Sequence, residues 1–219
     1  MPKGVPAAGY RMSKNRVNGT LPIPNMQPQP TLHFQPKSHF TINERFEFIS
    51  QLVGLVASNI QPSAIITGKG GLGKTYTVIK SLETVGFTNV SGKEVESEEK
   101  TFRVVKGYSS PKGLYRSLFE NQNNIIVFDD TDAILDHDIS LNILKAALDS
   151  YDERIITWNA DLKDDLPKEF EFKGRIIFIS NRSHNSIDQA IRSRSMMVDL
   201  TMTTDEMIER MAYIAEQPS

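Results

Sequence analysis

The sequence predicts an α/β fold of three layers, in which a parallel sheet of about five strands is covered by helices on both faces. Short, continuous apolar runs alternate along the chain with segments whose apolar residues recur every three or four positions. Strands that alternate with helices in this way form parallel sheets. The runs lack the apolar–polar alternation of a half-exposed strand, which is typical of strands that are buried on both faces.

The first expected element is a helix over residues 41–59. Thr41 and Glu44 have the spacing of a capping box, in which each side chain binds the other residue's backbone N–H. The apolar residues that follow recur at helical spacing. They are Ile49, Leu52, Val53 and Val56.

Strands and helices then alternate up to residue 200. The expected strands are residues 63–68, 101–105, 124–130, 175–181 and 196–200. The expected helices between them are residues 74–86, 111–122 and 138–151. Pro111 suits the first turn of its helix, where no backbone N–H is needed. In the third helix, Leu141, Leu144 and Leu148 share one face, which we expect to pack on the sheet.

The N-terminal segment differs from this core in composition. Residues 1–40 carry five of the 25 basic residues and none of the 27 acidic ones, and residues 1–38 hold seven of the eleven prolines. Proline cannot continue a helix or a central strand, so an extended arm is expected. The arm could bind nucleic acid or a protein partner, order against a neighbouring copy, or remain a solvated tail. The predicted domains are therefore the arm (1–40), the core (41–201) and the start of a C-terminal helix (202–219).

Several classes of protein are not expected. The chain has no run of eighteen apolar residues, which a membrane-spanning helix needs, and no apolar segment of a secretory signal. It has no cysteine, which excludes disulfides and thiolate metal sites. These features favour a cytoplasmic compartment and argue against a membrane partner.

Residues 66–78 read ITGKGGLGKTYTV and contain the pattern G-x-x-x-x-G-K-T between Gly68 and Thr75. Phosphate binding needs backbone N–H groups and a helix N-terminus that converge on the anion, and glycines permit this backbone path. Lys74 is expected to contact the β- and γ-phosphates of a nucleotide, and the Thr75 hydroxyl to hold Mg²⁺. The expected nucleotide-binding residues are Gly68, Lys69, Gly70, Gly71, Leu72, Gly73, Lys74, Thr75 and Tyr76.

The strand at 124–130 ends in two aspartates, the pattern known as Walker B. Asp129 is expected to hold the Mg²⁺ shell, directly or through water, and Asp130 to polarise an attacking water. Aspartate reaches one methylene less far than glutamate, so slow hydrolysis and help from Asp132 are open alternatives. Asp130 and Asp132 could also simply cap the segment that follows.

The pattern K-G-G-x-G-K-T from Lys69 also fits the partition-type ATPases, which dimerise face to face, but no D-x-D-P motif follows it. Instead, the strand RIIFISN ends in Asn181, and DQAIRSRSMMVDL places Arg192 and Arg194 just before the last strand. In this order of phosphate loop, carboxylates, asparagine and arginine, residues 41–217 resemble the AAA+ ATPases. The phrases GYSSPKGLYRSLFENQNNIIVFDDTD and FEFKGRIIFISN look most like the small AAA+ ATPases of bacteriophages.

The resemblance implies a role for each of these residues. Asn181 would orient the hydrolytic water. Arg194, with Arg192 in reserve, would reach the γ-phosphate of a neighbouring copy and neutralise charge in the transition state. Lys69 would be a solvent-exposed loop lysine. Both arginines could instead be surface charges at a helix end.

The resemblance also implies an activity, namely Mg-ATP hydrolysis by a homo-oligomeric ring or arc, with a hexamer as the expected assembly. The likeness to phage proteins favours a DNA replication or remodelling motor in the host cytoplasm. A nucleotide-dependent assembly switch or scaffold with slow hydrolysis is the alternative. AAA+ proteins usually continue into a helical lid, and the sequence offers only the start of one helix, with Met207, Met211 and Ile214 on one face. A reduced or missing lid is therefore expected.

Two segments are candidates for contact with a substrate. Residues 106–113 follow the second expected strand and contain Tyr108. Residues 153–175 are expected to form a hairpin with Trp158 and Lys163 near its tip, where viral superfamily-three helicases carry a DNA-gripping hairpin. A lysine for phosphate and an aromatic ring for stacking would suit single-stranded DNA. Each aromatic ring could instead pack on its own domain.

Overall fold

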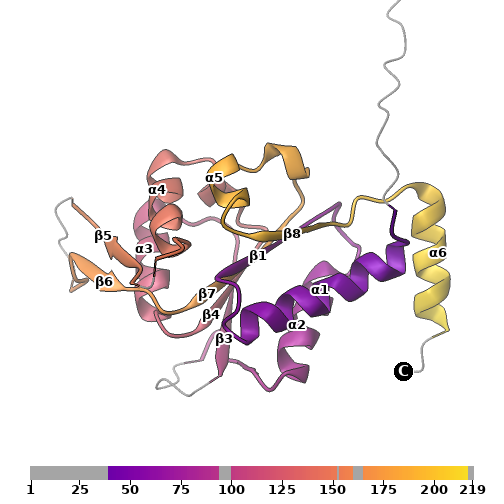
Figure 1. Cartoon of the computed structure of the whole chain (residues 1–219), viewed down its shortest axis with the longest axis horizontal. Coiled ribbons are helices and arrows are strands. Elements are labelled where there is room, and N and C mark those ends of the chain that lie inside the picture. The colour runs from indigo at the N-terminus through magenta and orange to yellow at the C-terminus, as the bar shows by residue number, and fades with distance from the viewer. Residues whose placement is uncertain (1–38, 94–99, 152, 160–164, 217–219) are drawn as a thin grey trace, which may run out of the picture. The chain divides into compact units, whose positions relative to one another are not determined.

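The structure is a computed structural model that describes residues 39–93, 100–151, 153–159 and 165–216. Its centre is a parallel sheet of six strands in the order β2-β3-β4-β7-β1-β8 (Figure 1). The strands are β1 (Ser63–Thr67), β2 (Thr88–Asn89), β3 (Thr101–Lys106), β4 (Ile125–Asp129), β7 (Arg175–Ser180) and β8 (Met196–Asp199). The arm expected over residues 1–40 lies, up to residue 38, outside the described residues.

Five of these six strands were expected from the sequence, and β2 was not. It contains two residues, too few to produce a hydrophobic pattern. Hydrogen bonds to the neighbouring strand define it instead, from the Thr88 N–H to the Lys100 carbonyl (2.9 Å) and from the Val90 N–H to the Phe102 carbonyl (3.0 Å). The prediction of about five strands therefore missed one short edge strand.

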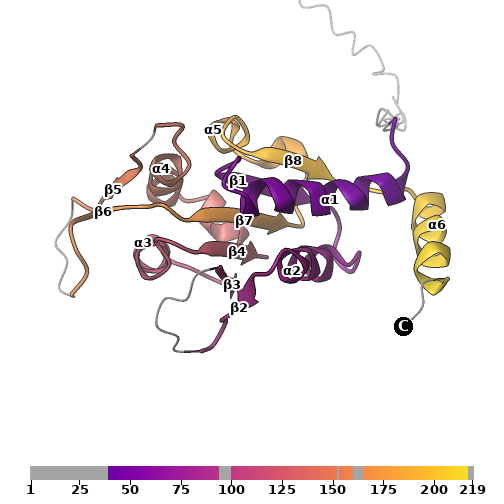
Figure 2. The same ribbon diagram turned by 60° about the horizontal axis from the view of Figure 1, so that its bottom comes forward.

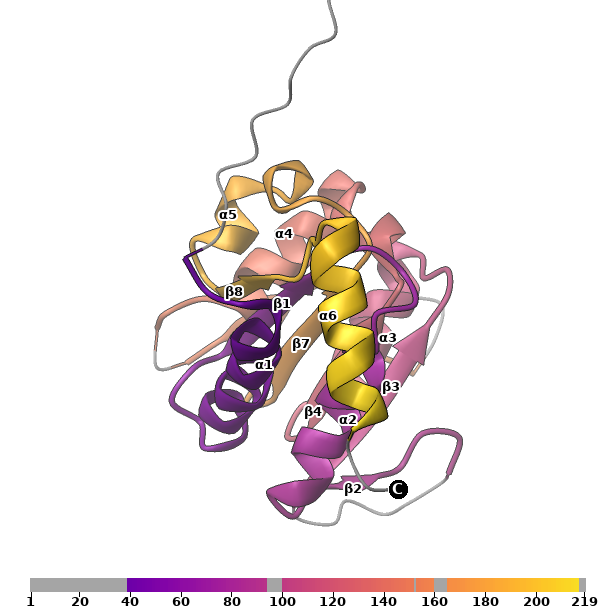
Figure 3. The same cartoon turned by 90° about the vertical axis from the view of Figure 1, so that its right-hand side faces the viewer.

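Helices cover both faces of the sheet, as predicted. The helices in the described part of the chain are α1 (Ile42–Ala57), α2 (Lys74–Thr84), α3 (Pro111–Glu120), α4 (Asp138–Ala147), α5 (Gln189–Arg192), which was not expected, and α6 (Thr204–Ala215), which lies beside α1. Helices α1 and α2 pack on one face, whereas α3 and α4 pack on the other (Figures 2 and 3). Two 3-10 turns, η1 (Asp132–Leu135) and η2 (His184–Ser186), lie in the connections after β4 and β7. The three-layer α/β fold is confirmed.

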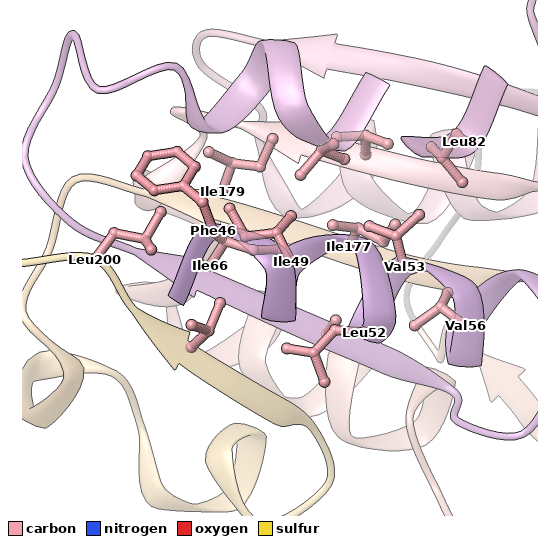
Figure 4. Packing of buried hydrophobic residues seen from close by; sticks show 14 of the residues in the cluster. Phe46, Ile49, Leu52, Val53, Val56, Ile66, Leu82, Ile177, Ile179 and Leu200 are labelled. Carbon is pink, nitrogen blue, oxygen red and sulfur yellow. The ribbon is translucent and has the colours of Figure 1, made fainter. Parts of the chain in front are cut away.

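Successive residues of the central strands face opposite cores. Ile66 of β1 and Ile177 of β7 contribute to the core under α1, where the Ile49 side chain of α1 is buried (Figure 4). Their neighbours Ile65 and Phe178 belong to the core on the other face. Burial of each side chain of this size stabilises the fold by about 1.5–3 kcal/mol. Since helices bury both faces of the sheet, apolar residues are favoured on both faces. This explains why the strands read as continuous apolar runs.

Local backbone features set the helix ends. Helix α1 begins with the expected capping box, in which the Thr41 N–H donates to Glu44 Oε2 (2.7 Å) and the Glu44 N–H donates to Thr41 Oγ1 (3.3 Å). It ends two residues earlier than predicted, because Asn59 has a φ of +59° and cannot continue a helix. Helix α4 also ends early, at Ala147, whose carbonyl accepts a hydrogen bond from Arg154 Nη1 (2.9 Å).

Residues 153–175 contain the expected hairpin. Strand β5 (Ile155–Thr157) pairs antiparallel with β6 (Glu169–Glu171). The Trp158 ring packs on Tyr115 of α3, with ring centroids 5.5 Å apart, and contacts the core below α3 and α4. These contacts agree with the alternative of an inward-packed ring, although the Trp158 side chain is only half-buried, and its stacking role stays a prediction. Lys163 lies outside the described residues.

Polar contacts attach helix α6 to α1. The Arg45 side chain is buried, and it donates to the Thr201 carbonyl (2.7 Å) and to Glu206 Oε1 (2.5 Å). The Arg210 guanidinium lies over the Phe46 ring, 3.9 Å from its centroid. Of the three apolar residues expected on one face of this helix, Met207 packs against the core, whereas Met211 and Ile214 are exposed. The prediction that this face is apolar is correct, but only its first residue packs on the described domain.

Candidate active site

The predicted nucleotide-binding residues gather at the carboxyl ends of β1, β4 and β7. In the sheet order, β7 lies between β1 and β4, so the residue that follows β7 is placed between the phosphate loop and the Walker B aspartates. A pocket of about 250 Å³ opens there. It is lined by Gly70, Gly71, Leu72, Gly73, Lys74, Thr75, Tyr76, Asp129, Asp130, Ile179 and Asn181. In open parallel sheets, ligands bind at this edge.

The loop between β1 and α2 has a backbone that glycine permits. Gly68 has a φ of +141°, and a Cβ atom there would lie 3.0–3.3 Å from Leu200. Gly73 precedes the first residue of α2 in a left-handed conformation, with a φ of +82°, and supplies no side-chain cap. The first N–H groups of α2 therefore have no side chain to accept them, which suits an anion at the helix N-terminus.

Lys74 is buried at the centre of the site. Its Nζ donates to the carbonyls of Gly68 (2.7 Å) and Lys69 (2.8 Å) and to Asn181 Oδ1 (2.9 Å). Burial lowers the pKa of Lys74, while the nearby carboxylates of Asp130 and Asp129 oppose this shift. The ammonium group is thus held in place by three neutral acceptors, and a phosphate would add a negatively charged hydrogen-bond partner.

Thr75 and Asp129, the two residues predicted to hold Mg²⁺, are in direct contact. The Thr75 hydroxyl donates to Asp129 Oδ1 (2.8 Å), and Asp129 is buried. Hydroxyl and carboxylate oxygens are ligands that Mg²⁺ accepts, usually together with substrate phosphates and water. Within the described residues, no group of three acidic or histidine side chains could hold a metal by itself. The two residues therefore fit a Mg²⁺ ion that also contacts a nucleotide.

Asp130 and Asn181 are joined at the open side of the pocket. Asn181 Nδ2 donates to Asp130 Oδ1 (2.7 Å), so one amide links Asp130 to Lys74. Asp130 has a φ of +54°, in the left-handed region, where aspartate and asparagine are enriched among non-glycine residues. Its N–H donates to the Ile179 carbonyl of β7 (3.1 Å). This backbone turn directs the Asp130 side chain to Asn181.

Asp132, the alternative helper, is engaged elsewhere. Its Oδ1 accepts a hydrogen bond from Ser180 Oγ (2.7 Å), and its Oδ2 lies 3.4 Å from Arg182 Nε. Arg182 also pairs with Asp136, and its hydrogen bonds lower the pKa of that carboxyl group. Asp132 therefore ties η1 to the end of β7. The expectation that it assists hydrolysis is not supported by these contacts.

Arg192 and Arg194 lie at the opposite end of the strands. Met196 pairs with Ala64 in the β8–β1 register, and the Arg194 carbonyl accepts from Ser63 Oγ (3.1 Å) at the start of β1. By this register, Arg194 is level with Pro62, six residues before Gly68. At the rise of a strand, the distance from Arg194 to the start of the phosphate loop is roughly 20 Å. Within one chain, the structure does not bring these arginines to the phosphate loop.

The Arg194 side chain lines a groove of about 860 Å³ at that end. Its Nη1 donates to the Ala190 carbonyl (3.1 Å). Three large apolar residues that line the same groove are exposed, namely Ile60, Tyr151 and Met196. The arginine therefore stands on an open surface that is partly apolar.

Sequence reasoning missed Ile179, which lines the pocket, and a lysine that contacts Asp129. Lys106, the last residue of β3, places its Nζ 3.0 Å from Asp129 Oδ2. Lys106 and Asp129 are partners in the parallel register of β3 and β4. The signal available in the sequence was that Lys106 ends the strand that precedes the Walker B strand, but the pairing of these strands had to be known first.

Comparison with known proteins agrees with this geometry. Residues 64–202, more than half of the chain, match the ATPase family associated with various cellular activities (AAA). The chain belongs to the AAA family. The match spans the phosphate loop, both Walker B aspartates, Asn181 and the two arginines. The partition-type interpretation of Lys69 is therefore wrong, and the side chain of Lys69 is exposed in the loop.

A phage protein is also similar to this AAA ATPase. It is an uncharacterized 36.7 kDa protein from the nrdC-mobD intergenic region of Enterobacteria phage T4, 34% identical over 187 residues. The match covers 76% of this chain and 53% of the phage protein, so the chain spans about half the length of that relative. The predicted likeness to phage AAA ATPases is confirmed. Among the described residues, no helix is long and apolar enough to cross a membrane.

Proposed function

We propose that this AAA protein hydrolyses ATP with Mg²⁺ in the pocket at the carboxyl edge of the sheet. The observation that carries the proposal is the hydrogen-bonded series from Lys74 through Asn181 to Asp130, set beside the pair of Thr75 and Asp129. These residues supply, in one place, a cation for phosphate, a carboxylate for water and oxygen ligands for a metal.

Each residue has a separate task in this mechanism. Lys74 Nζ neutralises charge on the β- and γ-phosphates, and the Asp130 carboxylate accepts a proton from the attacking water. Asn181 fixes the relative position of both groups through its amide. Bound Mg²⁺ would supply positive charge to the phosphate oxygens at Thr75 and Asp129.

The Lys74→Met variant tests this assignment. It is expected to weaken ATP binding by about 10- to 100-fold, because it removes a buried charged hydrogen-bond donor, and to abolish turnover. Binding is measured by fluorescence titration with a labelled ATP analogue. Lys80→Met, which changes an exposed lysine of α2, is the matched control. ATP binding and turnover by Lys74→Met at the level of the control would contradict the proposed function.

We further propose that the active site is completed by a second copy of the chain in a homo-oligomeric ring, with six copies as the expected number. Arg194 stands roughly 20 Å along the sheet from its own phosphate loop and cannot serve it. Head-to-tail contact between copies would place the Arg194 groove of one copy against the nucleotide of the next. Such heterologous contacts close into rings when the rotation permits. The exposed apolar residues around Arg194 support a protein partner on this surface.

For the substrate, we propose a DNA replication or remodelling role in the host cytoplasm. The similarity to a phage T4 protein supports a phage context, although that relative is itself uncharacterized. Single-stranded DNA is expected to raise ATP turnover about threefold or more, because motors couple hydrolysis to an engaged substrate. Turnover is measured across DNA concentrations at two salt concentrations, since phosphate contacts weaken with salt. Identical turnover with and without DNA would contradict this role.

An assembly switch that binds ATP and hydrolyses it slowly is the second candidate. One observation favours it, namely that the carboxylate of Asp130 is short and that its Oδ1 already accepts from Asn181. In this case ATP would control assembly, and turnover would contribute little.

A further inference from the structure

The ion pair between Lys106 and Asp129 lies inside the proposed metal site. Lys106 Nζ is 3.0 Å from Asp129 Oδ2, while Asp129 Oδ1 accepts from the Thr75 hydroxyl (2.8 Å). Both carboxylate oxygens of Asp129 are therefore engaged, one of them by a cation. The parallel register of β3 and β4 places these two residues side by side at the strand ends.

The two partners of this ion pair differ in their exposure to solvent. The Asp129 side chain is 5% exposed, whereas the Lys106 side chain is 65% exposed. An ion pair with one solvated partner is weak, because water and salt compete for the charge. Asp129 is held by its strand and by Thr75, so the lysine is the partner that can leave.

Lys106 also begins the loop that leads to α3. Gly107 follows with a φ of +82°, and Tyr108, next in the chain, is 82% exposed. The loop ends at Ser110, which caps α3 by accepting from the Gly113 N–H (3.1 Å). One end of the loop is thus fixed by a helix cap, and the other end by the pairing of β3 with β4, to which the Lys106–Asp129 ion pair adds a side-chain contact.

We propose that Lys106 is a positioning residue whose ammonium group occupies Asp129 until Mg²⁺ binds and competes with the metal for this carboxylate. Binding of Mg²⁺ is thereby coupled to the loop that carries Tyr108. The inference rests on the proposed function, in which Thr75 and Asp129 hold Mg²⁺. A divalent cation at this carboxylate, held directly or through water, would place its positive charge beside the ammonium group of Lys106 and repel it. The backbone of Lys106 stays paired in the β3–β4 ladder, so release of its side chain moves a positive charge beside Gly107 and Tyr108 and changes the surroundings of the Tyr108 side chain.

The experiment uses Mg²⁺ titrations of the full chain with ADP bound, followed by calorimetry. Lys106→Met is expected to bind Mg²⁺ about 2- to 5-fold more tightly, because a weak competing ion pair is removed. Lys106→Arg retains a cation and is expected to restore the original affinity. Lys173→Met is the matched control, because the Lys173 side chain is 64% exposed and pairs with Glu171 at 2.8 Å, away from the site.

The coupling to the loop is measured with a fluorescent label. The chain has no cysteine, so Tyr108→Cys accepts a thiol-reactive dye at one position. With Lys106 present, Mg²⁺ is expected to change the dye emission at the same concentrations at which calorimetry detects binding. With Lys106→Met added, the Mg²⁺-dependent change is expected to disappear while binding persists.

The outcomes distinguish failure of the role of Lys106 from failure of the proposed Mg-ATP hydrolysis. Unchanged or weaker Mg²⁺ affinity in Lys106→Met, or a dye response that persists in that variant, would overturn the role of Lys106 while leaving the Mg-nucleotide site intact. If the unsubstituted chain binds nucleotide without any dependence on Mg²⁺, the proposed function fails, and the inference fails with it.

Discussion

Replacing Asp130 by asparagine is expected to lower kcat for ATP hydrolysis by about 100- to 1000-fold and to leave ATP affinity within about twofold. The loss is that of a general base or water-polarising carboxylate, which contributes on the order of 10²–10⁴ to a rate. The affinity for ATP is expected to persist, because the substitution leaves Lys74, Thr75 and Asp129 unchanged.

In this structure, asparagine at position 130 can keep the backbone conformation and the hydrogen bond of Asp130. The left-handed φ of Asp130, +54°, is tolerated by asparagine as well as by aspartate. The asparagine side chain retains an oxygen that can accept from Asn181 Nδ2, as Asp130 Oδ1 does. The change therefore removes charge and basicity while the hydrogen bond and the backbone conformation are preserved.

Steady-state turnover and ATP affinity are compared for Asp130→Asn and for Asp138→Asn, which removes an exposed carboxylate from the first turn of α4. The control should match the unsubstituted chain. If Asp130→Asn retains more than about a third of the turnover of the control, Asp130 is not the catalytic carboxylate. Very slow turnover in all three proteins would instead support the assembly switch.

The second large effect is expected for Arg194→Ala, with turnover reduced by about 100-fold or more. An arginine that neutralises transition-state charge contributes on the order of 10³–10⁵ in comparable phosphoryl-transfer enzymes. Because Arg194 lies far from its own phosphate loop, the loss should appear only where copies are assembled. Turnover per chain of the unsubstituted protein should accordingly rise with protein concentration.

Mixing identifies which copy the arginine serves. Unsubstituted chain is titrated with Arg194→Ala at constant total concentration, and turnover is expected to fall below the line for independent copies. Arg192→Ala, the neighbouring arginine of α5, is the comparison that separates the primary residue from the reserve. A linear mixing curve, together with turnover that does not depend on concentration, would mean that Arg194 acts in no neighbouring site.

The confirmed elements are those with a local physical signal. The capping box of Thr41 and Glu44 is fixed by contacts between residues three apart, and the buried strands show continuous apolar runs because both faces are covered. The phosphate loop is similarly local, since its glycines and the start of α2 are adjacent in the chain. For the same reason, the sequence missed β2, whose two residues are defined only by pairing with a distant segment.

The sequence by itself determined the fold class and the family, because both depend on residue types at short spacings, and it predicted most of the residues that line the pocket. Only the tertiary structure decided which side chains meet. It placed Lys106 on Asp129, joined Lys74 to Asp130 through Asn181, diverted Asp132 to Ser180, and packed Trp158 inward. The physical reason is that these contacts join residues of different helices, strands and loops, so they follow from strand order, register and helix packing, which no local pattern encodes.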